Sequence, residues 1–331
     1  QQLDTNYYSE DLLRIEQWGT INWSSFEKAF QNAIFLDVTA TDIPNLSNVT
    51  NVSYMFSNCS SLVFNNSINS WSTMNIQNFE GMFSYTMSFN QPIGNWNTSS
   101  ATSLNQMFRN AGAFNQFIGD WDVSSVTDFG EMFHYNPIYN QPLKDWSTDS
   151  AIDLGHLFCG ATQFNQDIST FNVTQVTDLS WFIFGAINFN QSLATWQLNS
   201  IIEGDFFFNF SGLDCINFTN TLLGWSNNIN LPNNIFLGIS NMEYSDSIIP
   251  TLNWYTNTKN WTFQGIFNQT ETCSLNNSNF DKTVLKISPN PTSNFINIEG
   301  TEVEKVDIYD AKGLHVQKTL NNNQIDISHL S

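Results

Sequence analysis

The sequence predicts an α/β repeat solenoid, followed by a small partial antiparallel β domain. Three observations support this fold class. Equivalent apolar residues recur at intervals of 25 along much of the chain. Within one repeat, the two halves have different apolar spacings, one typical of a short helix and the other of a short strand. Residues 284–331 lose the repeat and instead alternate apolar and polar residues.

Columns of equivalent residues define the repeat. One column is almost entirely Trp, namely Trp71, Trp96, Trp121, Trp146, Phe171 and Trp196. A second is aromatic: Phe64, Phe89, Phe114, Tyr139, Phe164 and Phe189. We predict that both columns form a core shared between coils, because a single coil cannot close a core by itself.

An Asn follows each member of the aromatic column: Asn65, Asn90, Asn115, Asn140, Asn165 and Asn190. Buried turns must satisfy their backbone polar groups. We therefore predict that these residues form an internal Asn ladder that bonds the backbone of the turns.

The second half of each repeat is predicted to be a short helix. Val126, Phe129, Met132 and Phe133 follow the i, i+3, i+6, i+7 spacing of one helix face. A residue suited to capping a first helical turn lies two places after the Val126 position, directly before the Phe129 position, and its equivalents recur in the repeats: Asn51, Asn78, Ser103, Asp128, Asp153 and Asp178. In the other half, Ile118–Val123 alternates apolar and polar residues, which predicts a brief strand.

The repeat also predicts the domain boundaries. Residues 1–48 hold an N-terminal segment and a degenerate first coil, and residues 49–211 hold the repeats. Residues 212–267 are predicted to cap the solenoid, because its last coil would otherwise expose the core. Residues 268–283, rich in Asn, Ser and Thr, are predicted to be a linker, and residues 284–331 a separate domain.

The repeat resembles a known family. The run from Phe114 through Trp121 to Thr127, closed by Glu131-Met132-Phe133, is similar to the 25-residue unit of BspA-like leucine-rich-repeat surface proteins. The similarity covers about residues 12–267. It implies leucine-rich-repeat-like coils and an adhesive role at a bacterial surface.

The C-terminal segment resembles a second family. Pro289-Asn290-Pro291 and the hairpin Tyr309-Asp310-Ala311-Lys312-Gly313 are similar to the C-terminal sorting domain of the type IX secretion system. This resemblance implies export by Bacteroidetes-group bacteria, contact with the secretion machinery, and a secreted or outer-membrane cell-surface location. The family pattern continues with a Gly-x-Tyr strand, whereas this sequence stops at Ser331, so we expect an incomplete domain.

Charge and composition exclude several functions. The net charge is −20 with only 10 Lys and Arg, which argues against nucleic-acid binding. No apolar run is long enough to span a bilayer. None of the cysteines, Cys59, Cys159, Cys215 and Cys273, forms a CxxC motif. Cys215 and Cys273 could pair in an oxidising compartment or remain free, and the sequence leaves both open.

The sequence contains no recognisable catalytic motif, and we predict a protein that is not an enzyme and needs no cofactor. His134 and His156 could lie in neighbouring coils, but no Cys or carboxylate has a ligand spacing around them, so we predict no metal site. Asp120, Asp122 and Asp145 could form a weak calcium site or a hydrolytic carboxylate pair. A solvated acidic face is the interpretation that we prefer.

Two surfaces could bind a partner. An exposed Trp column could stack on sugars, but repeat-invariant apolar positions are more often core. We therefore predict binding by polar positions that vary between coils: Asn95, Asn97, Asp120, Asp122, Lys144, Asp145, Thr170 and Asn172. The predicted function is an adhesin-like scaffold for extracellular or host-surface proteins. The alternative is a carbohydrate-binding surface module, and a secreted hydrolase is the third hypothesis.

Overall fold

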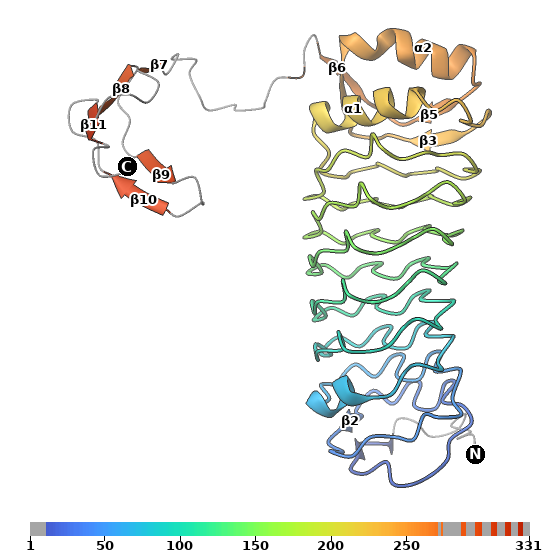
Figure 1. Cartoon of the computed structure of the whole chain (residues 1–331). Coiled ribbons are helices and arrows are strands. Elements are labelled where there is room, and N and C mark those ends of the chain that lie inside the picture. Colours follow the sequence, from blue (N-terminus) through green and yellow to red (C-terminus); the bar gives the residue numbers. More distant parts are fainter. Residues whose placement is uncertain are drawn as a thin grey trace. The chain divides into compact units, whose positions relative to one another are not determined.

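The computed structural model describes residues 11–270, Cys273 and five strands between residues 286 and 326. The chain divides into two compact units, residues 1–274 and 275–331. In the first unit, successive coils of backbone lie one above another (Figure 1). Isolated parallel bridges join equivalent residues of successive coils: Asn51, Asn78, Ser103, Asp128, Asp153, Asp178 and Glu203.

The helix predicted for each repeat does not form. From residue 72 to residue 214 the backbone contains turns and isolated bridges but no helix or extended strand. The reason is that the backbone N–H groups of each turn donate alternately to a carbonyl of the same coil and to a carbonyl of the next coil. Met132 N donates to Phe129 O within its coil at 3.1 Å, whereas Phe133 N donates to Leu157 O of the next coil at 3.0 Å. Glu131 also has a positive φ of 56°, which breaks a right-handed helix.

The residues predicted to cap helices do accept hydrogen bonds from backbone N–H groups, but they do so in turns. Oδ1 of Asp128 accepts a hydrogen bond from Gly130 N at 3.0 Å, and Oδ1 of Asp153 accepts one from Gly155 N at 2.7 Å. A carboxylate that bonds the N–H two residues later forms an Asx turn. These residues therefore start turns rather than helices.

The strand predicted over Ile118–Val123 is also absent. Trp121 N donates to Ile118 O at 3.2 Å, which closes a turn instead of extending the chain. Trp121 and Val123 are nevertheless buried, while Asp122 between them is exposed. The alternation of inward and outward side chains is thus present without strand backbone.

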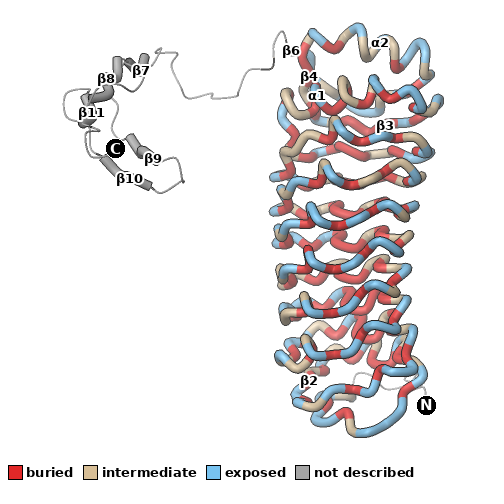
Figure 2. The backbone as a smooth tube through the Cα atoms, in the orientation of Figure 1, coloured by how far each residue is buried: buried red, intermediate tan, exposed pale blue. Residues whose placement is uncertain are grey.

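Aromatic rings stack along the core from coil to coil. The rings of Trp96 and Trp121 are 6.2 Å apart and nearly parallel, and those of Phe108 and Phe133 are 5.9 Å apart. Trp121 Nε1 donates to Ile93 O in the preceding coil at 3.1 Å. Every member of the Trp column is buried, and Figure 2 shows buried positions in coil after coil.

The Asn ladder runs along the surface of the stack and not inside it. Oδ1 of Asn90 accepts from Asn115 N at 3.0 Å, and Oδ1 of Asn115 accepts from Asn140 N at 2.9 Å. The same bond recurs to Asn165 and Asn190. Asn90, Asn140 and Asn165 are exposed. The ladder bonds turn backbone, but the prediction of an internal position is wrong.

The first coils contain short regular elements. Strand β1 (Arg14–Ile15) pairs in parallel with β2 (Asp37–Val38). The 3-10 helix η2 (Asn66–Ser70) begins after Asn65, whose side chain accepts from Ser67 N at 2.9 Å. Asn65, the first member of the Asn column, therefore caps a helical turn.

The last coils are more regular than the repeats. Their elements are α1 (Cys215–Ser226), β3 (Phe236–Gly238), β4 (Glu243–Ser245), the 3-10 helix η3 (Asp246–Ile248), α2 (Ile249–Asn257), β5 (Thr262–Gln264) and β6 (Asn268–Thr270). Strand β3 pairs with β5 and β4 with β6, all in parallel. Strand β6 and Cys273 belong to the first unit, so the predicted linker over 268–283 overlaps this region.

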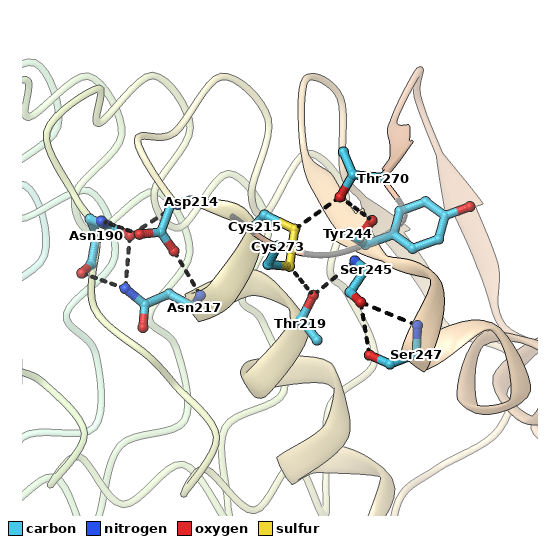
Figure 3. The surroundings of a disulfide bond; sticks show 10 residues. All are labelled: Asn190, Asp214, Cys215, Asn217, Thr219, Tyr244, Ser245, Ser247, Thr270 and Cys273. Carbon is cyan, nitrogen blue, oxygen red and sulfur yellow. Dashed lines mark hydrogen bonds between the residues drawn. A yellow bond between two sulfur atoms is a disulfide. The ribbon is translucent and has the colours of Figure 1, made fainter. Parts of the chain in front are cut away.

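A disulfide bond joins Cys215 to Cys273, with their Cα atoms 5.3 Å apart (Figure 3). It fastens the start of α1 to the segment after β6. The Asn ladder ends at the same place, because Asp214 N donates to Asn190 Oδ1 at 3.0 Å. Asp214 in turn caps α1 by accepting from Asn217 N at 2.8 Å.

The second unit consists of short antiparallel strands. Strand β8 (Phe295–Glu299) lies between β7 (Lys286–Ser288) and β11 (Gln324–Asp326). A second pair is formed by β9 (Val306–Tyr309) and β10 (His315–Lys318). The predicted turn at Gly313 lies outside the described residues.

Candidate binding face of the coil stack

Three columns of residues in the turns carry side chains that vary widely from coil to coil, and we call them the turn face. The first column has a positive φ throughout: Tyr54, Gly81, Gln106, Glu131, His156, Trp181 and Phe206. The second, three residues later, is Ser57, Ser84, Arg109, His134, Cys159, Phe184 and Asn209. The third is Asn58, Tyr85, Asn110, Tyr135, Gly160, Gly185 and Phe210.

Left-handed backbone fixes the first and third columns of the turn face. Each turn is bonded to the next coil, as when Glu131 N donates to Gly155 O at 2.9 Å and Tyr135 N to Cys159 O at 2.7 Å. Gly160, with a φ of 70°, has no side chain, and the Tyr135 ring fills the space that a Cβ would need. The turn face is therefore a fixed surface whose side chains pack against neighbours from adjacent coils.

Glu131 is the centre of a polar network on this face. Its carboxylate accepts from Arg109 Nη1 at 2.7 Å, from Gln106 Nε2 at 3.0 Å, and from His134 Nδ1 at 2.9 Å. The His134 hydrogen bond lowers the pKa of Glu131, against the effect of burial, and Arg109 lowers it further. The carboxylate is thus ionised and held by three side chains. Arg109 also lies over the Tyr85 ring, 5.8 Å from its centre.

Aromatic side chains gather at the C-terminal end of the turn face. The Trp181 ring lies 4.3 Å from Phe206 and 4.4 Å from Phe184. Phe184 contacts Phe210 edge to face at 5.6 Å. Phe210 is 52 % exposed, and the other three are partly exposed. We call these four residues the aromatic cluster, a type of surface that often marks a binding site.

Two histidines and a cysteine meet between the polar network and the aromatic cluster. The His156 ring lies 5.4 Å from His134 on one side and 5.6 Å from Trp181 on the other. One ligand atom from each of His134, His156 and Cys159 lies within 4.8 Å of the others. The expectation that no Cys or carboxylate has a ligand spacing around these histidines is therefore wrong for Cys159.

The sequence contained a signal for this cluster that the apolar columns obscured. Arg109, His134 and Cys159 are 25 residues apart in turn, as are Glu131 and His156. Residues in one column lie in neighbouring coils, and residues three apart lie in one turn. Following the polar columns with the same period would have brought the three side chains together.

The residues predicted to bind a partner lie elsewhere on the coils. Asn95, Asn97, Asp120, Asp122, Lys144, Asp145 and Thr170 are exposed, and Asn172 is partly buried. Several of these side chains accept hydrogen bonds from the backbone of their own turns. Asp122 Oδ1 accepts from Ser124 N at 3.1 Å, and Ser124 donates two hydrogen bonds that lower the Asp122 pKa. Asn97 and Asn172 bond Ser99 and Thr174 in the same way.

The Trp column does not offer a platform for sugars. Trp96, Trp121 and Trp146 are each 3 % exposed or less, and their Nε1 atoms donate to backbone carbonyls. A sugar ring cannot reach a buried indole. The prediction that this column belongs to the core is confirmed, and the alternative of a carbohydrate platform is wrong.

Comparison with protein-family models gives two matches. Residues 24–136 and 113–225 match the family described as Mycoplasma protein of unknown function, DUF285. Together the two matches cover residues 24–225, more than half of the 331-residue chain. The chain belongs to the DUF285 family. The overlap of the two matches reflects the repeat, and the DUF285 region includes the turn face from Tyr54 to Phe210.

The second match concerns the C-terminal unit. Residues 286–331 match the secretion system C-terminal sorting domain. This DUF285 protein is therefore exported by the type IX secretion system, to the cell surface or into the medium, and its tail contacts the secretion machinery. No curated protein and no solved structure matches the chain. Within the described residues, no helix has the length and apolarity needed to cross a membrane.

A partly buried column of carboxylates gives a pH-dependent prediction. Burial raises the pKa of Asp153 to about 6, against the hydrogen bond from Gly155, and Asp178, Asp128 and Glu131 raise it further. The folded state thus holds a proton more tightly than the unfolded state, whose pKa is near 3.8. Stability from this group is present below pH 4 and is lost as pH rises through 6.

We therefore expect Asp153→Asn to melt at a higher temperature than wild type at pH 8, and to lose that advantage at pH 4. The amide oxygen can still accept from Gly155 N. Asp149→Asn is the control, because hydrogen bonds from Asn172 and Ser147 lower the Asp149 pKa, so its removal brings no gain at pH 8. A lower melting temperature for Asp153→Asn at pH 8 would contradict the prediction.

Proposed function

We propose that the stacked coils form a leucine-rich-repeat-like solenoid of the BspA type, and that it acts as a non-enzymatic, adhesin-like scaffold that binds extracellular proteins through its turn face. The aromatic cluster of Trp181, Phe184, Phe206 and Phe210 is the observation that carries this proposal. Its four rings lie partly or largely exposed on adjacent coils.

The chemistry of the cluster fits protein recognition. Aromatic side chains bury a large area with few rotatable bonds, and Trp, Tyr and Arg are enriched among the residues that dominate binding energy. Tyr85 and Tyr135, further along the turn face, are 41 % and 52 % exposed, and Arg109 lies between their coils. A partner laid along the stack would therefore meet aromatic residues over several coils.

The backbone holds these side chains in place before binding. Trp181 N donates to Asp205 O at 2.7 Å, and Gly185 N donates to Asn209 O at 2.9 Å. A surface that is already ordered loses little conformational entropy when a partner docks. The net charge of −20 further favours partners with a basic surface, because complementary charge speeds association.

Export supports this function. The sorting domain directs the chain to the cell surface or the medium, where proteins of host and neighbouring cells are accessible. The disulfide bond between Cys215 and Cys273 suits that oxidising location. The sequence also contains none of the common catalytic motifs, which agrees with a binding role.

The test is a binding screen of the purified full chain against extracellular matrix proteins and glycans. We expect saturable binding to at least one protein. Trp181→Ala combined with Phe206→Ala should weaken it at least tenfold, because hot-spot aromatics contribute about 2 kcal/mol or more. Ile152→Ala is the matched control, since Ile152 is 46 % exposed but lies outside the turn face.

Three results would overturn the proposal. One is the absence of saturable binding to any protein, and another is equal affinity of the double variant and wild type. The third is binding to glycans alone, with quenching of Trp fluorescence, which would make the aromatic cluster a carbohydrate platform. Circular dichroism must show that the double variant folds like wild type, so that a loss of affinity reports on the surface.

A further inference from the structure

We propose that His134, His156 and Cys159 form a binding site for a transition-metal ion, with Zn²⁺ as the expected occupant. The proposal does not rest on the binding of a protein partner, and the site adjoins the aromatic cluster, because the His156 ring stacks on Trp181. It is built by two neighbouring coils, because His134 comes from one coil and both His156 and Cys159 come from the next.

The three donors are close enough to share one ion. Their ligand atoms all lie within 4.8 Å of one another. In a tetrahedral zinc site, Zn–N bonds of about 2.0 Å and Zn–S bonds of about 2.3 Å place the ligand atoms roughly 3.5 Å apart. Side-chain movements of about 1 Å would bring the three ligand atoms to the separations of a zinc site. The turns that carry the ligands need not move.

His156 also has a ring nitrogen without a partner. Its Nδ1 is buried and has no hydrogen-bond partner. Leaving such a nitrogen unsatisfied costs about 1–3 kcal/mol, so a buried lone pair of this kind calls for an explanation. Stacking against Trp181 fixes the ring at 5.6 Å, with an angle of 7° between the planes. Metal binding through Nδ1 would satisfy this nitrogen.

Glu131 supplies the second layer of the site. Its Oε2 lies 2.9 Å from His134 Nδ1. A carboxylate at one nitrogen of an imidazole fixes the tautomer and strengthens the other nitrogen as a metal ligand. Arg109 and Gln106 hold the same carboxylate in place at 2.7 and 3.0 Å. The polar network of the turn face therefore orients one of the three ligands.

The donor types select the metal. Two imidazoles and a thiol favour Zn²⁺ and other ions that accept nitrogen and sulfur ligands, and disfavour Ca²⁺ and Mg²⁺, which need oxygen. Cys159 is 1 % exposed. On binding, its S–H bond breaks, the proton leaves to solvent and the thiolate sulfur binds the ion. Three protein ligands leave the fourth position for water or for a group of a partner.

The experiment uses the full chain after treatment with a chelator. Calorimetry with Zn²⁺ should show one site, with a dissociation constant in the micromolar range or tighter. Co²⁺ should give the intense near-ultraviolet absorption of a thiolate–cobalt bond. Cys159→Ser should abolish that absorption and weaken Zn²⁺ binding at least 100-fold, whereas Cys59→Ser, which removes the other free buried cysteine, should change neither.

Two further variants keep the test decisive if Cys159→Ser folds poorly. His156→Gln, at a partly exposed position, should also weaken Zn²⁺ at least 100-fold. Glu131→Gln should weaken it by about 10-fold to 100-fold, the usual effect of losing a second-layer carboxylate. Absence of a saturable Zn²⁺ site in the wild type, or unchanged Zn²⁺ affinity in folded His156→Gln, would overturn the proposal.

Discussion

Trp121→Ala is expected to destabilise the coil stack by roughly 3–5 kcal/mol, the range for removing a large buried aromatic side chain. Trp121 is 3 % exposed and stacks on Trp96 in the neighbouring coil. Its loss would open a cavity and leave the Ile93 carbonyl without its donor. Each coil contacts only its neighbours, so a defect in the middle weakens both halves of the stack.

Equilibrium unfolding in urea, followed by Trp fluorescence and by circular dichroism, measures this loss. Trp121→Phe is the matched control, because it keeps a ring in the column but removes the Nε1 donor. It should cost about 1–3 kcal/mol, the penalty for an unsatisfied buried carbonyl together with a smaller ring. A loss below 1 kcal/mol for Trp121→Ala would show that the stacked Trp column contributes little.

Removing the disulfide is expected to have an effect of similar size at the C-terminal end of the stack. The bond closes a loop of 58 residues between Cys215 and Cys273. In the chain-entropy model, a loop of that length is stabilised by about 4 kcal/mol. The double variant Cys215→Ser and Cys273→Ser should therefore unfold α1 and the terminal coils more easily than the central coils.

Hydrogen exchange distinguishes this local effect from a global one. Amides of α1 (Cys215–Ser226) should exchange faster in the double variant, while amides around Phe133 keep their protection. A reductant should reproduce the change in wild type and leave the variant unaffected. Equal melting temperatures of the oxidised wild type and the double variant would contradict the prediction.

Regular spacing made some features of the fold accessible from the sequence. The period of 25 residues identified the Trp and Phe columns, and the structure buries each member of both. The same period located the residues that start turns, such as Asp128 and Asp153. These features depend only on which side chains repeat, and a repeat is visible in the sequence itself.

The backbone of the coils could not be derived in the same way. An i, i+3, i+7 spacing places Val126, Phe129 and Phe133 on one side both in a helix and in a row of turns. The difference lies in where the N–H groups find acceptors. Phe133 N uses Leu157 O from the next coil, and a single repeat gives no sign of that partner.

Nothing in the sequence indicated that the Trp row continues after the 25-residue repeat ends. Trp225 falls outside the 25-residue register, yet its Nε1 donates to Leu193 O at 2.8 Å. Trp196 makes the corresponding bond to Ile168 O at 3.1 Å. Helix α1 therefore brings Trp225 to the end of the same row, although the chain reaches that place by a different path.

By itself, the sequence determined the repeat period, the identity of the core columns and the C-terminal sorting domain at residues 286–331. Only the tertiary structure decided the turn backbone, the pairing of Cys215 with Cys273, and the meeting of His134, His156 and Cys159. The physical reason is common to all three. Each depends on contacts between coils, and such contacts exist only after one coil has closed and the next has stacked on it.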